Sequence, residues 1–135
     1  MAILSETLLT VRYVETDQMG IVHHSNYVQY LELARIDWLS QLGISYKELE
    51  SKGIILPVYT LDLKFKKSAY FDDQLIVKTC LENLPKATMK FDYKIFNQYQ
   101  DLITIASTTL VFVNAVTKKP RSCPEDLLSI FTKHM

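Results

Sequence analysis

The chain has 135 residues, a size that suits one domain and lets roughly two-thirds of the unfolded chain's surface become buried. Hydrophobic residues make up 48% and charged residues 22%, which excludes the polar, highly charged composition of disordered chains. Lys plus Arg and Asp plus Glu each number 15, so no net basic field favours nucleic acid or an anionic membrane surface.

The N-terminus and the cysteines bear on location. Residues 1–10, MAILSETLLT, lack a charged start followed by a long apolar stretch, and no apolar run approaches the ~20 residues that span a bilayer. Cys80 and Cys123 lie far apart and form no CxxC or Cys/His ligand spacing. We therefore expect a cytoplasmic, unexported protein with one domain over residues 1–135, no membrane span and two reduced thiols, with a disulfide as the alternative.

The first elements in chain order are a strand, a polar loop and a long helix. Residues 6–14, ETLLTVRYV, mix β-branched and aromatic residues as strands do. Asn26 followed by Gln29 predicts a capping box at the start of the helix, and Gly43 suits the left-handed position after its end. Between them, apolar residues recur at helical spacing: Tyr27, Leu31, Ala34, Trp38 and Leu42.

A short helix and four strands follow. Ser45 with Glu48 repeats the capping signal, and Gly53 closes this second helix. After Pro57 the apolar period changes to two, which predicts a strand with one face on the core. The residues expected on that face are Tyr59, Leu61, Leu63 and Phe65.

Three more strands are predicted at 74–84, 87–97 and 102–116, separated by turn-forming residues, and a short helix is predicted from about Pro124 onward. Sequential strands with short turns favour antiparallel pairing. One long apolar helix ahead of them favours an α+β fold in which the sheet curls around that helix.

The polar loop ETDQMGIVHHSNY, residues 15–27, is the candidate for chemistry. It directly precedes a helix N-terminus, where unpaired N–H groups and the helix dipole favour a negative oxygen. A nearby carboxylate would supply the base or nucleophile of an acyl hydrolase. Asp17 is the candidate, because Gly20 lets the chain turn back towards the helix. The alternative is that Asp17 and Glu15 are solvated turn acids.

The histidines and lysines allow further interpretations. Adjacent His23 and His24 cannot readily face one ion, and no further acidic or histidine cluster accompanies them, so we expect no metal site. His24 is a candidate base, with packing at the helix start as an equal alternative. Lys66 and Lys67, near Lys64, either bind phosphate or form the solvated face of an edge strand.

Motifs of other enzyme classes are missing from the sequence. The chain has only 3 glycines, which are dispersed, and it contains no GxSxG elbow, phosphate-binding glycine loop or dinucleotide fingerprint. We therefore expect neither a serine hydrolase nor a bound cofactor.

Three segments resemble the hotdog-fold acyl-CoA thioesterases of the 4-hydroxybenzoyl-CoA thioesterase type. KKSAYFDDQL (66–75) is similar to the family's link between its second and third strands, and VNAVTKKPRSCPEDL (113–127) to its closing hairpin and tail. The longest match, ETDQMGIVHHSNYVQYLELAR (15–35), has Met19 where a smaller residue is expected. Its matching positions are Asp17, Gly20, Ile21, Val22, His23, His24, Tyr27, Glu32, Ala34 and Arg35.

The resemblance implies a five-stranded antiparallel sheet wrapped around one long central helix. It also implies a homodimer with sheets joined edge to edge and active sites at the interface, or a homotetramer built from two such dimers. Asp17 would be the catalytic base or nucleophile, and the backbone N–H of His24 would bind the oxyanion. The residues that would line the substrate site are Gly20, Val22, His23 and Tyr27, with Lys66 and Lys67 at the nucleotide phosphates.

The implied function is hydrolysis of acyl-CoA thioesters to the free acid and CoA. Glu32 and Arg35, spaced as a same-face pair, would fix the helix and not act on substrate. Three alternatives remain open: a thioesterase acting on acyl-carrier protein, a non-catalytic module that binds acyl-CoA, and a dehydratase acting on 3-hydroxyacyl thioesters.

Overall fold

The computed structural model describes residues 2–135. In chain order it has β1 (Ile3–Thr10), a 3₁₀ turn (Tyr13–Glu15), α1 (Ser25–Gln41), α2 (Tyr46–Ser51), β2 (Ile54–Ile55) and β3 (Val58–Phe65). These are followed by β4 (Gln74–Leu81), β5 (Thr88–Phe96), β6 (Leu102–Val111), β7 (Val113–Asn114) and α3 (Glu125–His134). The predicted order of elements is confirmed, with β2 and β7 added as a small antiparallel ribbon.

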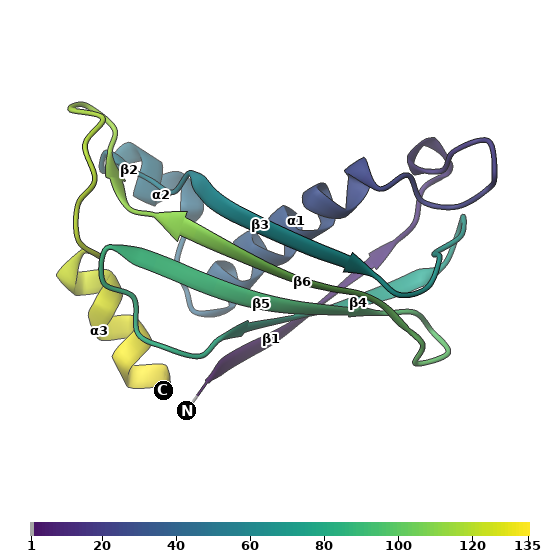
Figure 1. The fold of residues 1–135 in the computed structure, drawn as a ribbon. Helices are drawn as coiled ribbons and strands as arrows, with labels where there is room; N and C mark the ends of the chain where they lie inside the picture. Colours follow the sequence, from purple (N-terminus) through teal and green to yellow (C-terminus); the bar gives the residue numbers. More distant parts are fainter. Residues whose placement is uncertain (1) are drawn as a thin grey trace.

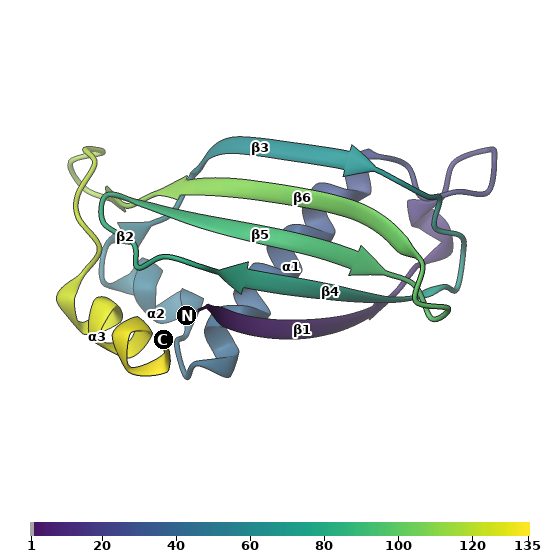
Figure 2. The same cartoon turned by 60° about the horizontal axis from the view of Figure 1, so that its bottom comes forward.

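The main sheet has five strands in the order β1-β4-β5-β6-β3, and every neighbouring pair is antiparallel. The long helix α1 runs diagonally across one face of this sheet (Figures 1 and 2). The predicted α+β arrangement with an antiparallel sheet is therefore confirmed. Pairing is not sequential throughout, because β3 lies beside β6 and the segment 66–73 carries the chain from there to β4.

The core lies between α1 and the sheet. Trp38 of α1 meets Phe91 of β5 edge-on at 4.9 Å and Phe131 of α3 at 5.5 Å between ring centroids. All three side chains are buried, and truncating such an aromatic core residue to Ala typically costs about 3–5 kcal/mol. The predicted inward residues of β4 and β5 are buried as expected: Leu75, Val77, Thr79, Leu81, Met89, Phe91, Tyr93 and Ile95.

One edge of the sheet, β1, is covered by side chains of α1. Trp38 Nε1 donates to the carbonyl of Ile3 at 3.1 Å, and Gln41 Nε2 donates to the carbonyl of Glu6 at 3.3 Å. The hydroxyl of Thr7 donates to Asp37 at 2.6 Å. The first two bonds engage main-chain carbonyls of this edge strand, and the third ties a β1 side chain to α1.

The opposite edge strand, β3, has mostly exposed side chains on both faces. The expectation that its alternating apolar residues face the core is wrong within one chain: Tyr59 is 75%, Leu61 43% and Phe65 52% exposed, and Leu63 is half-buried. The reason is that α1 packs chiefly against β1 and β4, and its ring contact with β3 lies at the end of that strand, between Tyr27 and Phe65.

Some local sequence signals for helix caps and strand ends agree with the structure and others do not. Ser45 caps α2 as predicted, accepting from the Glu48 N–H at 3.2 Å, and Gly43 after α1 has a positive φ of 79°. The first strand starts and ends earlier than predicted, because residues 13–15 form a 3₁₀ turn. None of the helices within residues 2–135 has the length and apolar character to cross a bilayer.

Candidate active site

Residues 15–23 form a short hairpin that leads into α1. The Asp17 N–H donates to the Ile21 carbonyl at 2.8 Å, and Thr16 and Val22 form a bridge below it. At the tip the Gly20 N–H donates to the Asp17 carbonyl at 2.9 Å, with Gly20 at a φ of +80° that a side chain would strain. The predicted turn at Gly20 is thus confirmed as a structural feature.

The half-buried carboxylate of Asp17 is held at one oxygen only. Its Oδ1 accepts from the Met19 N–H at 2.8 Å within the turn, and Oδ2 has no hydrogen-bond partner within residues 2–135. Glu15 differs from the turn acid that the sequence allowed, because only 6% of the residue is exposed and its side chain is fully engaged. One carboxylate therefore supports the hairpin, and the other has an oxygen available for chemistry.

The start of α1 differs from the prediction. The helix begins at Ser25 and not at Tyr27, and the predicted capping box of Asn26 and Gln29 is wrong: the Asn26 amide donates to the Glu15 carbonyl at 2.8 Å. His23 acts at the helix start instead, with Nδ1 2.8 Å from the Ser25 hydroxyl and 3.3 Å from the Ser25 N–H. Tertiary contact with the hairpin has thus drawn Asn26 away from the cap.

The next backbone donor, the N–H of His24, gives a hydrogen bond to no group within residues 2–135. His24 has helical backbone angles, and its side chain makes no capping bond. Its exposed imidazole stacks on that of His23 at 4.2 Å between ring centroids. An unpaired N–H at the positive end of a 17-residue helix is suited to a negative oxygen.

Two bonds tie the hairpin to the segment that follows β3. The Val22 N–H donates to the Ala69 carbonyl at 2.9 Å, and Ile21 bridges to Tyr70. These bonds bring the end of β3 beside the start of α1, at the right of Figure 1. Segments almost 50 positions apart in sequence therefore share one surface.

A cavity of about 330 Å³ lies at this junction. Both predicted catalytic residues line it, as do four of the predicted substrate-binding residues, and Gly20 and His23 do not. The lining residues are Asp17, Met19, Ile21, Val22, His24, Tyr27, Phe65, Lys66, Lys67 and Ser68.

Sequence reasoning missed the apolar wall of this cavity. Phe65, at the end of β3, lies 5.3 Å from Tyr27 between ring centroids. Burial raises the pKa of the Tyr27 hydroxyl, so this side chain is a neutral wall and donor. The alternation of β3 marked Phe65 as core-facing, but no local signal placed this strand end next to the loop. Met19, Ile21 and Ser68 complete the unpredicted lining.

The two lysines are not equivalent. Lys67 pairs with Asp101 at 2.9 Å, and hydrogen bonds from Lys67 and Asn97 lower the pKa of that carboxyl. Lys66 is exposed and forms no ion pair among the described residues. The Glu32–Arg35 pair is present but long, at 3.7 Å, with Arg35 buried and Glu32 exposed. Residues 2–135 contain no cluster of three or more His, Cys, Asp or Glu side chains suited to a metal ion.

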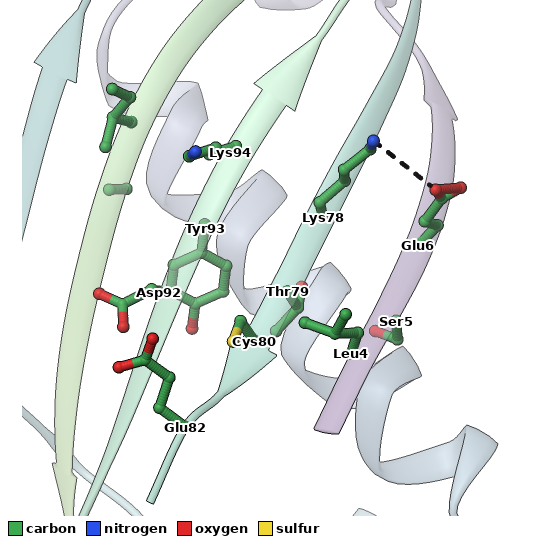
Figure 3. Close-up of a pocket in the computed structure, with 12 residues that line it drawn as sticks. Leu4, Ser5, Glu6, Lys78, Thr79, Cys80, Glu82, Asp92, Tyr93 and Lys94 are labelled. Atoms are coloured by element: carbon green, nitrogen blue, oxygen red, sulfur yellow. Dashed lines mark ion pairs between the residues drawn. The ribbon is translucent and has the colours of Figure 1, made fainter. Parts of the chain in front are cut away.

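A larger cavity, of about 550 Å³, lies elsewhere, on the face of the sheet away from α1 (Figure 3). None of the predicted site residues lines it. Its one thiol, Cys80, is a poor nucleophile, because burial and then the nearby charges of Glu82 and Asp92 raise its pKa. Lys78 at its rim pairs with Glu6 at 3.9 Å. The smaller cavity beside α1 is therefore the better candidate, on chemistry and not on size.

Comparison with known proteins identifies the family of the chain. Residues 11–131 match the family model of the thioesterase-like superfamily. A Bacillus subtilis protein provisionally named acyl-CoA thioesterase YneP is 32% identical over 117 residues, which is 87% of this chain and 85% of that protein. The acyl-CoA thioester hydrolase YbgC of Escherichia coli is 27% identical over 121 residues, 90% of each chain.

A solved structure gives the same result. The DHNA-CoA thioesterase of Staphylococcus aureus superposes with a TM-score of 0.92 at 37% identity, covering 96% of this chain and 89% of that one. Both the sequence match and the structural match extend over nearly the whole chain, including the hairpin and α1. The chain therefore belongs to the thioesterase-like superfamily of hotdog-fold thioester hydrolases.

Proposed function

We propose that the chain, as one catalytic domain over residues 1–135, hydrolyses acyl-CoA thioesters to the free acid and CoA at the cavity beside α1. One observation carries the proposal: Asp17, with a free carboxylate oxygen, and His24, with an unpaired N–H at the N-terminus of α1, line the same cavity. These are the two groups that thioester hydrolysis needs, a base or nucleophile and an oxyanion donor. The named acyl-CoA thioesterases among the relatives support the choice of substrate.

In this mechanism Asp17 acts through Oδ2, because Oδ1 is occupied by the Met19 N–H. As a base, the carboxylate takes a proton from a water molecule whose oxygen attacks the thioester carbonyl. The carbonyl oxygen gains the negative charge and is bound by the His24 N–H. The tetrahedral intermediate then expels the thiolate, a good leaving group because thiol pKa values lie near ~8.5.

As a nucleophile, an Asp17 carboxylate oxygen would instead attack the thioester carbon and expel the CoA thiolate, which leaves a mixed anhydride that water then cleaves to the free acid and the carboxylate. Both routes use the same two groups and release the same products. Incorporation of ¹⁸O from labelled water into Asp17 during turnover would identify the anhydride route with water attack at the Asp17 carbonyl, since the base route leaves both side-chain oxygens in place.

We propose that the functional unit is a homodimer joined through β3. Exposed apolar residues on the inner face of β3 and its unpaired edge support this choice, because soluble chains rarely leave such an edge open. The cavity opens beside Phe65 at the end of that strand. A second copy paired there would border the cavity, which gives the site its place at the interface. Pairing of two such dimers into a tetramer is compatible with this arrangement.

The test is release of free thiol from a panel of short-, medium- and long-chain acyl-CoAs, benzoyl-CoA and the corresponding acyl-carrier proteins. Asp17→Asn should lower kcat at least ~10²-fold, the lower end of what a positioned base supplies. The fold should persist, because the amide oxygen can still accept from the Met19 N–H.

Each alternative has its own outcome in this assay. Turnover confined to acyl-carrier proteins would show that the natural acyl carrier is that protein and not CoA. Binding of acyl-CoA without thiol release would make the chain a binding module, and formation of a 2-enoyl product would make it a dehydratase. Full activity of Asp17→Asn would refute the proposed mechanism.

A further inference from the structure

Glu15 lies two residues before Asp17 but outside the candidate active-site cavity. Together with Arg12 and Tyr30, it lines a separate cavity of about 500 Å³ between β1 and α1. Only 6% of Glu15 is exposed, and a carboxylate is rarely so buried unless it is paired. Its burial therefore needs a reason that the proposed chemistry does not supply.

The Glu15 carboxylate is bound from two elements. Oε1 accepts from the Arg12 N–H at 2.8 Å and from the Tyr30 hydroxyl at 2.8 Å, and Oε2 accepts from Arg12 Nε at 3.0 Å. Arg12 follows β1, and Tyr30 belongs to α1. The carboxylate thus joins the chain entering the hairpin to the helix that leaves it.

The main chain of Glu15 fixes the other strand of the hairpin. Its carbonyl accepts from the His23 N–H at 2.9 Å and from the Asn26 side-chain amide at 2.8 Å. His23 directly precedes the unpaired donor at His24, and Asn26 lies in the first turn of α1. One residue therefore holds both sides of the hairpin against the helix.

Tyr30 also connects this network to the wall of the candidate site. Its ring meets that of Tyr27 edge-on at 5.7 Å, and Tyr27 in turn packs against Phe65. A change at Glu15 can therefore reach the carboxylate, the backbone donor and the aromatic wall without touching the cavity itself.

We propose that Glu15 is a positioning residue, which sets the orientation of the Asp17 carboxylate relative to the His24 N–H through its bonds to Arg12, Tyr30 and His23. This inference rests on the proposed function, since it assumes that these two groups act on the thioester. Catalysis is sensitive to such placement: a shift of about 1 Å at the reacting groups can cost roughly 10²-fold in rate.

A positioning role for Glu15 predicts that loosening the hairpin affects kcat and KM differently. Substrate contacts expected from Lys66 and Phe65 lie on the β3 side of the cavity, away from Glu15. Loosening the hairpin therefore lowers kcat, which depends on the geometry of the reacting groups, and leaves KM nearly unchanged. A residue that only stabilised the fold would change neither constant in the folded protein.

The test compares two buried tyrosines. Tyr30→Phe removes the hydroxyl bound to Glu15 and keeps the ring packed on Tyr27. Tyr93→Phe is the matched control, because Tyr93 is also buried and its hydroxyl is 2.8 Å from that of Thr108, far from the hairpin. We expect Tyr30→Phe to lower kcat about tenfold with KM within about twofold, and Tyr93→Phe to leave both constants unchanged.

A second pair of variants covers the case in which Tyr30→Phe fails to fold. Arg12 is largely exposed, so Arg12→Met should fold while removing the bond from Nε to Glu15. It should lower kcat in the same way, and Arg12→Lys should restore part of it. Hydrogen exchange of the His23 N–H should be faster in both Tyr30→Phe and Arg12→Met than in the wild type.

Asp17→Asn is measured beside these variants. Wild-type kcat values in the folded Tyr30→Phe, Arg12→Met and Tyr93→Phe proteins would overturn the positioning role. If Asp17→Asn is inactive in the same assay, the proposed function remains intact. An active Asp17→Asn would instead refute the proposed function. A rise in KM without loss of kcat would also overturn the role, because it would mean that Glu15 acts on substrate binding.

Discussion

Substituting His24 by proline isolates the proposed oxyanion donor. The substitution removes a single N–H that donates to no group within residues 2–135, so no existing hydrogen bond is lost. His24 has φ −54° and ψ −29°, and proline fixes φ near −65°. The backbone at this position therefore already has the angle that proline requires, just before the first residue of α1.

The two expected effects are of different size. Removing one oxyanion donor costs about 10²–10³ in kcat, or roughly 2.7–4 kcal/mol of transition-state stabilisation. A compatible proline changes folding stability by only about 0.4–1 kcal/mol, and in the favourable direction. Activity should thus fall by two to three orders of magnitude while Tm stays level or rises slightly.

His24→Ala is the matched control, because it removes the imidazole and keeps the N–H. Thiol release under saturating acyl-CoA gives kcat for both variants, and thermal unfolding followed by circular dichroism gives Tm. The donor assignment is refuted if folded His24→Pro turns over as fast as His24→Ala. Loss of activity in His24→Ala with retention in His24→Pro would assign catalysis to the imidazole instead.

Three further outcomes are expected. In steady-state kinetics at low salt, Lys66→Ala should raise KM for acyl-CoA and leave kcat unchanged. Lys67→Ala should have a smaller effect on KM, because Lys67 is paired with Asp101. Burial alone would raise the pKa of Glu15, but hydrogen bonds from Arg12 and the Tyr30 hydroxyl hold it below its ordinary value. Its stabilising effect is therefore present above the ordinary pKa of a glutamate and is lost as the pH falls through the lowered pKa, so Glu15→Gln should flatten the acid limb of Tm against pH. Leu61→Lys on β3 should shift sedimentation at micromolar concentration from dimer to monomer, and an unchanged profile would exclude β3 as the interface.

Local sequence signals predicted much of the fold. The apolar spacing from Tyr27 to Leu42 located α1 to within two residues at either end, because one face of this helix is buried along its length. Strict alternation placed the inward residues of β4 and β5 correctly for the same reason. The turn at Gly20 and the cap at Ser45 were predictable because each depends on residues within three positions.

Features that depend on distant partners were not predictable in this way. The strand that pairs with β3 is determined by the assembly of the whole sheet. The sequence therefore identified Phe65 as apolar but could not place it at the cavity. Glu15 had the local pattern of a solvated turn acid, because its hydrogen-bond partner Tyr30 lies well beyond the loop in sequence, within α1. Asn26 had the sequence pattern of a helix cap, but its side-chain amide donates to the Glu15 carbonyl in the hairpin. In each case a tertiary hydrogen bond or contact overrode a correct local propensity.

The two edges of the sheet differ in a way that limits growth of any assembly. Strands that add edge to edge can propagate into fibres when each new copy offers a fresh template. Here Trp38 and Gln41 of the same chain bond to two main-chain carbonyls of β1, so part of this edge is already engaged. If β3 pairs with a second copy as proposed, β1 becomes the outer strand at both ends of the composite sheet. The side chains of α1 would then make the addition of further strands less favourable, and a long, apolar and exposed β3 edge would be tolerable at high protein concentration.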